Sequence, residues 1–368
     1  MTRDTFEEVI LRHLQEQLAH RPAMEQQDIV KFVFQAMLGV GHLLSSRGAA
    51  EDYAAREMAL LSADSTEPLY EALSPAWCRL NLRGAKARAL TPSVIAGLMV
   101  SGKSPIPFTR QDVFAFCAKL AASSEKLISD PEALNQILDE SWLPSHSDAY
   151  REQYSPAYRV IPAEWIPRTE VLDRIAALRS DRILVTIDGP CATGKTTLAE
   201  KLAGIFEAAV VHTDDYVVPH ALKTKERLSV PGGNCDSSRL VQEVAAPWKQ
   251  GRTVAFRAYD CREDRLLPEK KLPDGRILIL EGSYCSLPAI RQYADVRIFL
   301  TAPWETRLER LRKRESPQSL QMFHDRWIPL EDRYFEAFGL PDPECIILNG
   351  DDPNGESPSE RPCAFRNP

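Results

Sequence analysis

An eight-residue string has the residue types and spacing of a phosphate-binding loop. Residues 189–196 read GPCATGKT and fit G-x-x-x-x-G-K-[ST] without a mismatch. The glycines let the backbone curl, so that successive N–H groups point at nucleotide phosphates, and the following helix adds its positive end. Lys195 would bridge the β- and γ-phosphates, and the Thr196 hydroxyl would ligate Mg²⁺. The residues expected to bind ATP are Gly189, Pro190, Cys191, Ala192, Thr193, Gly194, Lys195, Thr196 and Thr197.

The surroundings of this string argue against a chance match in a glycine-containing turn. An apolar run at 183–187 precedes the string and predicts a buried strand. A helix-forming run, TTLAEKLAGIF, follows it. Because a strand, a loop and a helix in this order are the setting that the motif requires, we expect ATP and Mg²⁺ as cofactors.

Carboxylates follow two further apolar runs. The run at 209–212 leads into Asp214 and Asp215, and the run at 276–280 leads into Glu281. An aspartate there can accept the proton of an attacking hydroxyl, and the residues alone leave this role open between Asp214 and Asp215. Glu281 can reach Mg²⁺ directly or through water. Structural roles stay open, since adjacent aspartates form Asx turns and backbone N–H groups can satisfy a carboxylate at the end of a strand.

Five basic residues lie within eight positions of a predicted helix. They are Arg307, Arg310, Arg312, Lys313 and Arg314. The first, second and last share a helix face, because they stand at i, i+3 and i+7. Such a face can close over triphosphate charge, and we expect Arg310 and Arg314 to do so. A solvated face paired with neighbouring glutamates is the alternative.

The elements that position these groups are predicted from apolar spacing. Short apolar runs at 183–187, 209–212, 253–258, 276–280, 296–300 and 345–348 predict strands, and helical segments separate most of them. This alternation is typical of a buried parallel sheet with helices on both faces. We therefore expect an α/β domain over residues 169–350 and a disordered tail over 351–368, which is rich in Pro, Ser, Glu and Asn.

The N-terminal part has a different texture. Residues 1–140 show apolar spacing of three and four and predict a helical domain, and residues 141–168 hold four prolines and predict a connector. A second ligand pocket could use His42, Glu57, Arg79 and Asn81, although a core histidine and capping residues are the simpler interpretation. The domain could be a scaffold or oligomerisation module, or a sensor or second enzyme.

Composition limits the classes of partner. The net charge of −7 gives no reason to expect nucleic acid or an anionic membrane. The charged N-terminal residues do not resemble a signal peptide, and no run of about 18 apolar residues predicts a membrane span. The eight cysteines form no C-x-x-C pair, as expected for reduced thiols in the cytoplasm.

Several segments resemble the uridine kinase-like branch of the P-loop kinases over residues 180–350. The matching segments are GPCATGKTT, TDDY, YDC, LILEG, VRIFLTAPWETRLERLRKR, GGNCDSSRL and RWIPLEDRYFEAF. The resemblance implies a three-layer α/β/α P-loop kinase domain with a mainly parallel sheet, here preceded by an all-α domain. It also implies ATP-dependent phosphoryl transfer to a small-molecule hydroxyl acceptor, a nucleoside first of all.

The resemblance can be carried over residue by residue on the acceptor side. It implies that Asp214 is the base and that Tyr259 lines the acceptor site. The expected acceptor-binding residues are Asp215, Tyr216, Asp236, Tyr259 and Asp264. Uridine kinases have a histidine where this chain has Asp264, and their ribose-gripping F-D-H-P segment has no clear counterpart. A vitamin, pantothenate-like or sugar acceptor, a homo-oligomer, and a regulator that uses ATP as a switch therefore also remain open.

Overall fold

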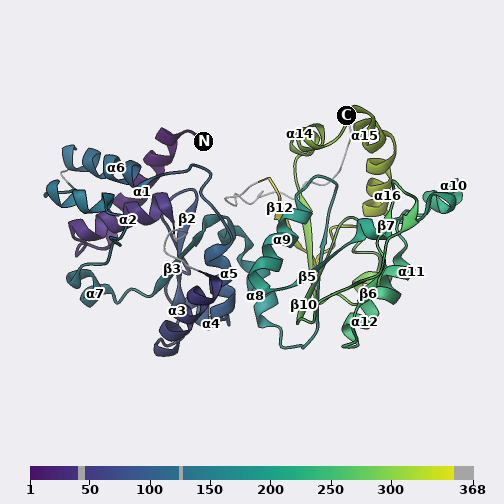
Figure 1. Ribbon diagram of the computed structural model, residues 1–368, viewed down its shortest axis with the longest axis horizontal. Coiled ribbons are helices and arrows are strands. Elements are labelled where there is room, and N and C mark those ends of the chain that lie inside the picture. Colours follow the sequence, from purple (N-terminus) through teal and green to yellow (C-terminus); the bar gives the residue numbers. More distant parts are fainter. Residues whose placement is uncertain (40–45, 124–126, 352–368) are drawn as a thin grey trace. The chain divides into compact units, whose positions relative to one another are not determined.

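The computed structural model describes residues 1–39, 46–123 and 127–351 (Figure 1). His42 and almost all of the predicted disordered tail lie outside the described residues. The chain divides into two compact units, unit 1 (Met1–Thr169) and unit 2 (Glu170–Pro368). Among the described helices, none is both long enough and apolar enough to cross a membrane.

Unit 2 is built on a parallel five-stranded sheet. Its strands are β4 (Ile183–Asp188), β5 (Ala209–His212), β10 (Ile277–Glu281), β11 (Val296–Thr301) and β12 (Ile346–Asn349). They lie in the order β12-β11-β4-β10-β5, and every pairing is parallel. Every residue of β4 and β10 is buried, because helices cover both faces of the sheet. The predicted α/β fold with a parallel sheet is therefore confirmed.

Helices on opposite faces of this sheet have different roles. Figure 1 shows α8 and α9 on one side and α11, α12 and α16 on the other. The second group packs Trp248 and Tyr334 against Leu184 and Leu278 in one buried cluster. The helices of unit 2 are α8 (Thr169–Ala177), α9 (Lys195–Phe206), α10 (Lys225–Ser229), α11 (Ser237–Leu240), α12 (Ala246–Lys249), α13 (Pro288–Arg291), α14 (Trp304–Arg314), α15 (Pro317–Met322) and α16 (Ile328–Phe338).

One predicted strand does not join the sheet. The run at 253–258 contributes only β6 (Ala255–Phe256), which pairs antiparallel with β9 (Lys270–Lys271). Val254, Phe256 and Ala258 are buried in alternation, so one face of this ribbon packs on the core. An alternating run of this length predicts one buried face, and it does not identify the partner strand. A second ribbon pairs β7 (Tyr259–Asp260) with β8 (Arg265–Leu266).

Unit 1 is mainly helical, and it also contains a small sheet. Its helices are α1 (Arg3–His20), α2 (Gln26–Leu38), α3 (Arg47–Leu60), α4 (Leu82–Ala87), α5 (Pro92–Val100), α6 (Arg110–Ala122) and α7 (Asp148–Tyr154). Its antiparallel strands are β1 (Tyr70–Ala72), β2 (Trp77–Asn81) and β3 (Tyr158–Pro162). A mainly helical domain precedes unit 2, as predicted. The domain is not all-α, however, because it contains this three-stranded sheet. The sheet was missed because β3 belongs to the proline-rich segment and pairs far along the chain.

Candidate active site

The phosphate loop connects the end of β4 to the start of α9, and two glycines give it its shape. Gly189 has a φ of +136°, and a Cβ there would lie 2.2 Å from the Leu300 carbonyl oxygen. Gly194 has a φ of +99° and precedes the first residue of α9. Only glycine adopts these left-handed conformations readily, and no side chain fits at the first position. The loop backbone therefore lies directly against β11.

Lys195 lies inside the loop. Its Nζ donates to the carbonyl oxygens of Gly189, at 2.7 Å, and Pro190, at 2.9 Å. The side chain is buried, so the ammonium group is held by the curled backbone. An ammonium in this position is ready to exchange carbonyl oxygens for phosphate oxygens.

Thr196 and Glu281 meet beside the loop. The Thr196 hydroxyl donates to Glu281 Oε1 at 3.1 Å, and His212 Nδ1 lies 2.5 Å from the same oxygen. Glu281 ends β10 and is buried, and its hydrogen bond raises the pKa of His212. A hydroxyl and a carboxylate are oxygen ligands of the kind that Mg²⁺ prefers.

A protein-only metal cage is not present in the part of the chain that the structure describes. No cluster of three or more His, Cys, Asp and Glu side chains is arranged there to hold an ion. Mg²⁺ commonly binds one or two protein oxygens and completes its shell with waters and substrate phosphates. Thr196 and Glu281 fit this pattern.

The adjacent aspartates Asp214 and Asp215 face different charges. Both lie in the short helical turn after β5, and the surrounding protein raises the pKa of both carboxyls by limiting their hydration. Asp214 is exposed at the surface, and Lys195 opposes the rise in its pKa while Glu281 adds to it. For Asp215 the first opposing group is His212. Of the two aspartates, Asp214 is therefore the one whose pKa the positive charge of Lys195 lowers most directly.

The other predicted acceptor residues fall into two groups. Tyr216 is buried and its hydroxyl donates to Glu243 at 3.1 Å, while Asp236 caps α11 by accepting from the Arg239 N–H. Tyr259 donates its hydroxyl proton to Asp264 in the β7–β8 ribbon. The structure thus joins Tyr259 to Asp264 and gives Tyr216 and Asp236 partners within the protein.

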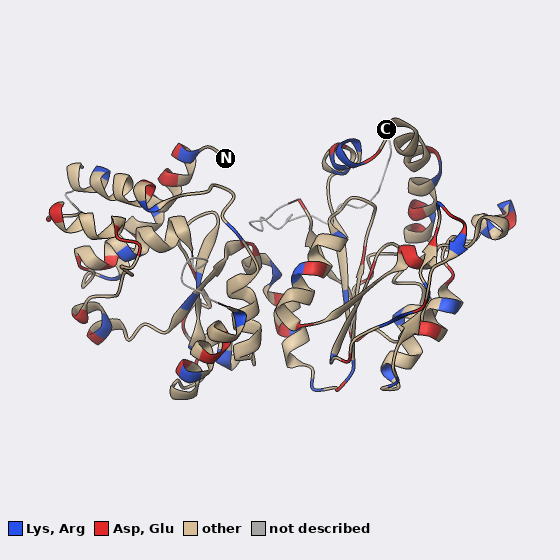
Figure 2. Cartoon of the chain, viewed as in Figure 1, with Lys and Arg blue, Asp and Glu red and all other residues tan. Residues whose placement is uncertain are grey.

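The basic helix α14 contacts the loop through two of its arginines. Figure 2 shows basic residues gathered on α14. Arg307 Nε donates to the Cys191 carbonyl at 2.9 Å, and Arg310 Nη1 donates to the Ala192 carbonyl at 3.1 Å. Arg314 bonds to Glu315 and is largely exposed. The structure therefore brings Arg310 to the loop, as the face was expected to do, and adds Arg307 instead of Arg314.

Two further carboxylates hold the loop and were missed by sequence reasoning. Glu331 of α16 accepts from the Cys191 N–H at 2.9 Å and from the Ser283 hydroxyl at 2.6 Å. Asp188 is fully buried, and it accepts from the Gly189 N–H at 2.7 Å and from the Tyr334 hydroxyl at 2.7 Å. Burial raises the pKa of Asp188. No local pattern marks these residues, since Glu331 reaches Cys191 across 140 positions and Asp188 reaches Tyr334 across 146.

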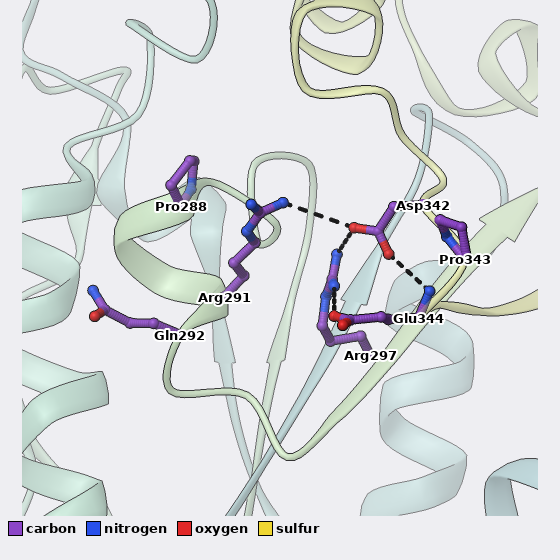
Figure 3. Close-up of a pocket in the computed structure, with 7 residues that line it drawn as sticks. All are labelled: Pro288, Arg291, Gln292, Arg297, Asp342, Pro343 and Glu344. Atoms are coloured by element: carbon purple, nitrogen blue, oxygen red, sulfur yellow. Dashed lines mark hydrogen bonds and ion pairs between the residues drawn. The ribbon is translucent and has the colours of Figure 1, made fainter.

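A separate pocket lies at the opposite end of the sheet. It has a volume of about 640 Å³ and lies at the start of β11 (Figure 3). Its lining residues are Pro288, Arg291, Gln292, Arg297, Asp342, Pro343 and Glu344. Arg297 pairs with both Asp342 and Glu344, so its charge is already neutralised. The phosphate loop follows the carboxyl end of β4, so this pocket is not part of the candidate active site.

The described candidates in unit 1 bond to different partners. Arg79 is buried and bonds to Gln35 and Glu71. Glu57 pairs instead with Arg159, and the Asn81 side chain caps α4. The second pocket expected from these residues therefore remains a prediction, with Arg79 as its only deeply buried member among the described candidates.

One family of known proteins matches part of unit 2. Residues 184–317 match the model of the Phosphoribulokinase / Uridine kinase family. No curated protein matches the chain.

Several solved structures are similar to this chain over about half of its length. One is described as a "possible uridine kinase" from Bacillus stearothermophilus, with 22% identity, a TM-score of 0.38, and coverage of 49% of this chain and 99% of that chain. Another is YFH7 from Saccharomyces cerevisiae, with 13% identity, a TM-score of 0.37, and coverage of 46% and 93%. The family match, the phosphate loop and the parallel sheet show that unit 2 has the fold of a P-loop kinase domain and is similar to the Phosphoribulokinase / Uridine kinase family.

Proposed function

We propose that the protein transfers the γ-phosphoryl group of ATP to a hydroxyl of a small molecule, with nucleosides as the leading acceptor class. The observation that carries this proposal is the phosphate loop that holds Lys195, with the Thr196–Glu281 hydrogen bond beside it and Asp214 in the turn after β5 of the same sheet. A carboxylate at that position can act on an acceptor that approaches the phosphate held by the loop.

The residues divide the transfer among them. The loop N–H groups and Lys195 bind the β- and γ-phosphates. Arg307 and Arg310 donate to carbonyl oxygens of the loop, and they add positive charge beside it. Mg²⁺, when bound by Thr196 and Glu281, would neutralise phosphate charge.

Asp214 acts on the acceptor. It takes the hydroxyl proton as the acceptor oxygen bonds to the γ-phosphorus and the bond to the β–γ bridging oxygen breaks. ADP leaves, and no protein side chain is phosphorylated on the way.

Asp214 is a better candidate base than Asp215. Lys195 is the first charged group that opposes the rise in the Asp214 pKa, whereas His212, Lys270 and Arg239 do this for Asp215. The backbone carbonyl of Asp215 also accepts from Arg239 at 2.9 Å. Asp215 is therefore oriented by groups outside the loop.

The acceptor is less defined than the nucleotide. Asp264 stands where uridine kinases have a histidine, and it accepts the hydroxyl proton of Tyr259. The His220 N–H donates to the same carboxylate at 3.1 Å, so this side of the site is closed by internal hydrogen bonds. The first experiment must therefore cover nucleosides, sugars and vitamins together.

That experiment measures ADP release from ATP and Mg²⁺ with each acceptor in turn. A kinase shows release that depends on one acceptor, and Asp214→Asn lowers this rate by roughly 10²–10⁴-fold while ATP still binds. Asp215→Asn is the matched control and should retain most of the rate. Full transfer by Asp214→Asn would exclude this base, and ATP binding without acceptor-dependent release from any compound would favour the switch protein.

A further inference from the structure

Three polar side chains interrupt the apolar surface of α2 in unit 1. Asp28, Lys31 and Gln35 stand at i, i+3 and i+7, so they share one face of the helix. Asp28 is completely buried, while Lys31 and Gln35 are partly exposed. This face therefore runs from the interior of unit 1 towards solvent.

A chain of hydrogen bonds leads from one end of this face towards the other. His146 Nδ1 lies 2.7 Å from Asp28 Oδ1, and His146 Nε2 lies 2.6 Å from the Tyr158 hydroxyl. The Tyr158 hydroxyl is also 3.4 Å from Gln35 Oε1. The chain therefore begins on α2 at Asp28 and ends at Tyr158, next to Gln35, and Lys31 lies between Asp28 and Gln35 along the helix.

The protonation of this chain follows from burial. Loss of hydration lowers the pKa of His146 to about 4, so the imidazole is neutral near pH 7. Nδ1–H then donates to Asp28, and Nε2 accepts from Tyr158. Burial also raises the pKa of Tyr158 to about 12. The chain is therefore a fixed frame, in which Asp28 carries the only charge.

Near Gln35, two arginines, Arg21 and Arg79, share one counterion, Glu71. Gln35 Oε1 accepts from Arg79 Nε at 3.0 Å and from Arg79 Nη2 at 2.8 Å. Glu71 lies 2.5 Å from both Arg79 and Arg21. One carboxylate thus serves two guanidinium groups.

Lys31 is the cation that lacks such a counterion. Its Nζ donates to the Pro144 carbonyl at 3.2 Å, and no carboxylate pairs with it among residues 1–39, 46–123 and 127–351. Partial burial, and then the positive charges of Arg79, Arg151 and Arg159, lower its pKa to about 8 against the opposing charge of Asp28. The Gln35 amide nitrogen likewise donates to no acceptor within those described ranges. Two donors with unused N–H groups therefore stand one helical turn apart.

We propose that unit 1 binds a small oxyanion, a carboxylate or phosphate group, through Lys31 Nζ and Gln35 Nε2. The local charges are unequal, since Arg79, Arg151 and Arg159 act on Lys31 against Asp28, while Glu71 is shared by Arg21 and Arg79 and Glu57 pairs with Arg159. An oxyanion would neutralise the excess and accept from both free donors. Gln35 is already oriented by its two hydrogen bonds from Arg79, so its amide loses little freedom on binding. This site is independent of the proposed kinase reaction.

The test measures the reactivity of Lys31 itself by competitive amine labelling and mass spectrometry. The full chain carries Lys195→Ala, so that the phosphate loop does not compete, and ionic strength is fixed with chloride. Sodium phosphate should protect Lys31 at least about tenfold, or sodium succinate should do so, and the pH midpoint of labelling should rise from about 8 towards the ordinary lysine value. Lys119, which is exposed and paired with Glu7, is the control lysine and should label equally in all buffers.

A second variant shows whether the effect arises from this pair of donors. Gln35→Glu places a carboxylate one turn from Lys31, so it should raise the labelling midpoint without added anion and abolish protection. Circular dichroism checks that the variant is folded. Protection by phosphate alone or by succinate alone identifies the group that binds. Equal labelling of Lys31 in chloride, phosphate and succinate, in the folded chain with Gln35 unchanged, would overturn the proposal.

Discussion

Each of the two units contains a carboxylate–histidine pair, and the pKa of the histidine is shifted in opposite directions in the two pairs. In unit 2, His212 Nδ1 lies 2.5 Å from Glu281, and in unit 1, His146 Nδ1 lies 2.7 Å from Asp28. The His212 side chain is 42% exposed and its pKa is raised, whereas that of His146 is 6% exposed and its pKa is lowered to about 4. Hydration, and not the distance between partners, therefore determines whether the pair is ionic.

The two carboxylates are also occupied differently. Asp28 accepts from Glu25 N–H at 3.0 Å, Ser147 N–H at 3.1 Å and the Ser147 hydroxyl at 2.6 Å, in addition to His146. Glu281 receives one hydroxyl and one imidazole on a single oxygen. Glu281 thus keeps an oxygen for chemistry, while Asp28 is fully used in holding unit 1 together.

The largest expected effect is on turnover, and it follows from replacing the unit 2 carboxylate, Glu281. Glu281→Gln should lower acceptor-dependent ADP release roughly 100-fold or more, since the charge stabilisation supplied by a bound metal is worth several kcal/mol. Unfolding in urea should change little. A variant with normal turnover across a Mg²⁺ titration would show that Glu281 is not a metal ligand.

The matching change in unit 1 should affect stability. Asp28→Asn leaves one of the donors around it unsatisfied, which should cost about 1–3 kcal/mol. Urea unfolding, followed by a probe in unit 1, measures the change, and Glu281→Gln serves as the control. An unchanged midpoint would mean that the hydrogen bonds of Asp28 are replaceable by water.

Acidification should sharpen the same comparison. His146 is neutral in the folded protein and binds a proton more readily when unfolded, so stability is full above about pH 6.5 and falls as the pH drops towards 4. The loss between pH 7 and pH 5 should be about 2 kcal/mol, from the difference between the pKa of about 4 and the ordinary 6.5.

His212 should behave in the opposite way. Its raised pKa gives a contribution that is present below pH 6.5 and is lost as the pH rises through its folded value. Histidine NMR titrations distinguish the two residues, and His146→Gln should remove the acid-side loss. A midpoint for His146 near 6.5 would contradict the assigned burial effect.

The smallest effect concerns the two predicted arginines of α14, of which one contacts the phosphate loop and the other does not. Arg310 is bonded to the loop and Arg314 is not, so Arg310→Ala should raise the KM for ATP about tenfold, as expected for a lost charged hydrogen bond. Arg314→Ala should change it by less than about twofold, because exposed ion pairs contribute little. Equal effects would show that both arginines reach ATP when it is bound.

Local sequence carried most of what could be predicted about unit 2. The phosphate loop is defined by eight consecutive residues, and Glu281 and Asp214 follow short apolar runs. These signals survive because strand ends of a parallel sheet meet at one edge. Arg307 was on the predicted face, yet its contact with the Cys191 carbonyl depends on how α14 packs.

The remainder depends on long-range packing. Glu331 reaches Cys191 across 140 positions, and His146 reaches Asp28 across 118. Tyr216 stands in the predicted acceptor segment, but its ring is buried in the core because the turn after β5 directs it inward. No periodicity in a single sequence encodes such pairings, so helical spacing in α2 predicted a buried face and gave no sign of its polar partners.

The strand order β11-β4-β10-β5 has a consequence for how such an enzyme can change. The loop follows β4, the proposed Mg²⁺ ligand Glu281 ends β10, and the proposed base Asp214 follows β5, which is an edge of the sheet. Neighbouring strands are about 4.8 Å apart, so the proposed base lies two such spacings across the sheet from the strand that carries the loop. In the proposed reaction, nucleotide and acceptor would thus be bound by residues after separate strands. Insertions after the edge strand can therefore change which acceptor binds, while the residues proposed to bind ATP stay unchanged.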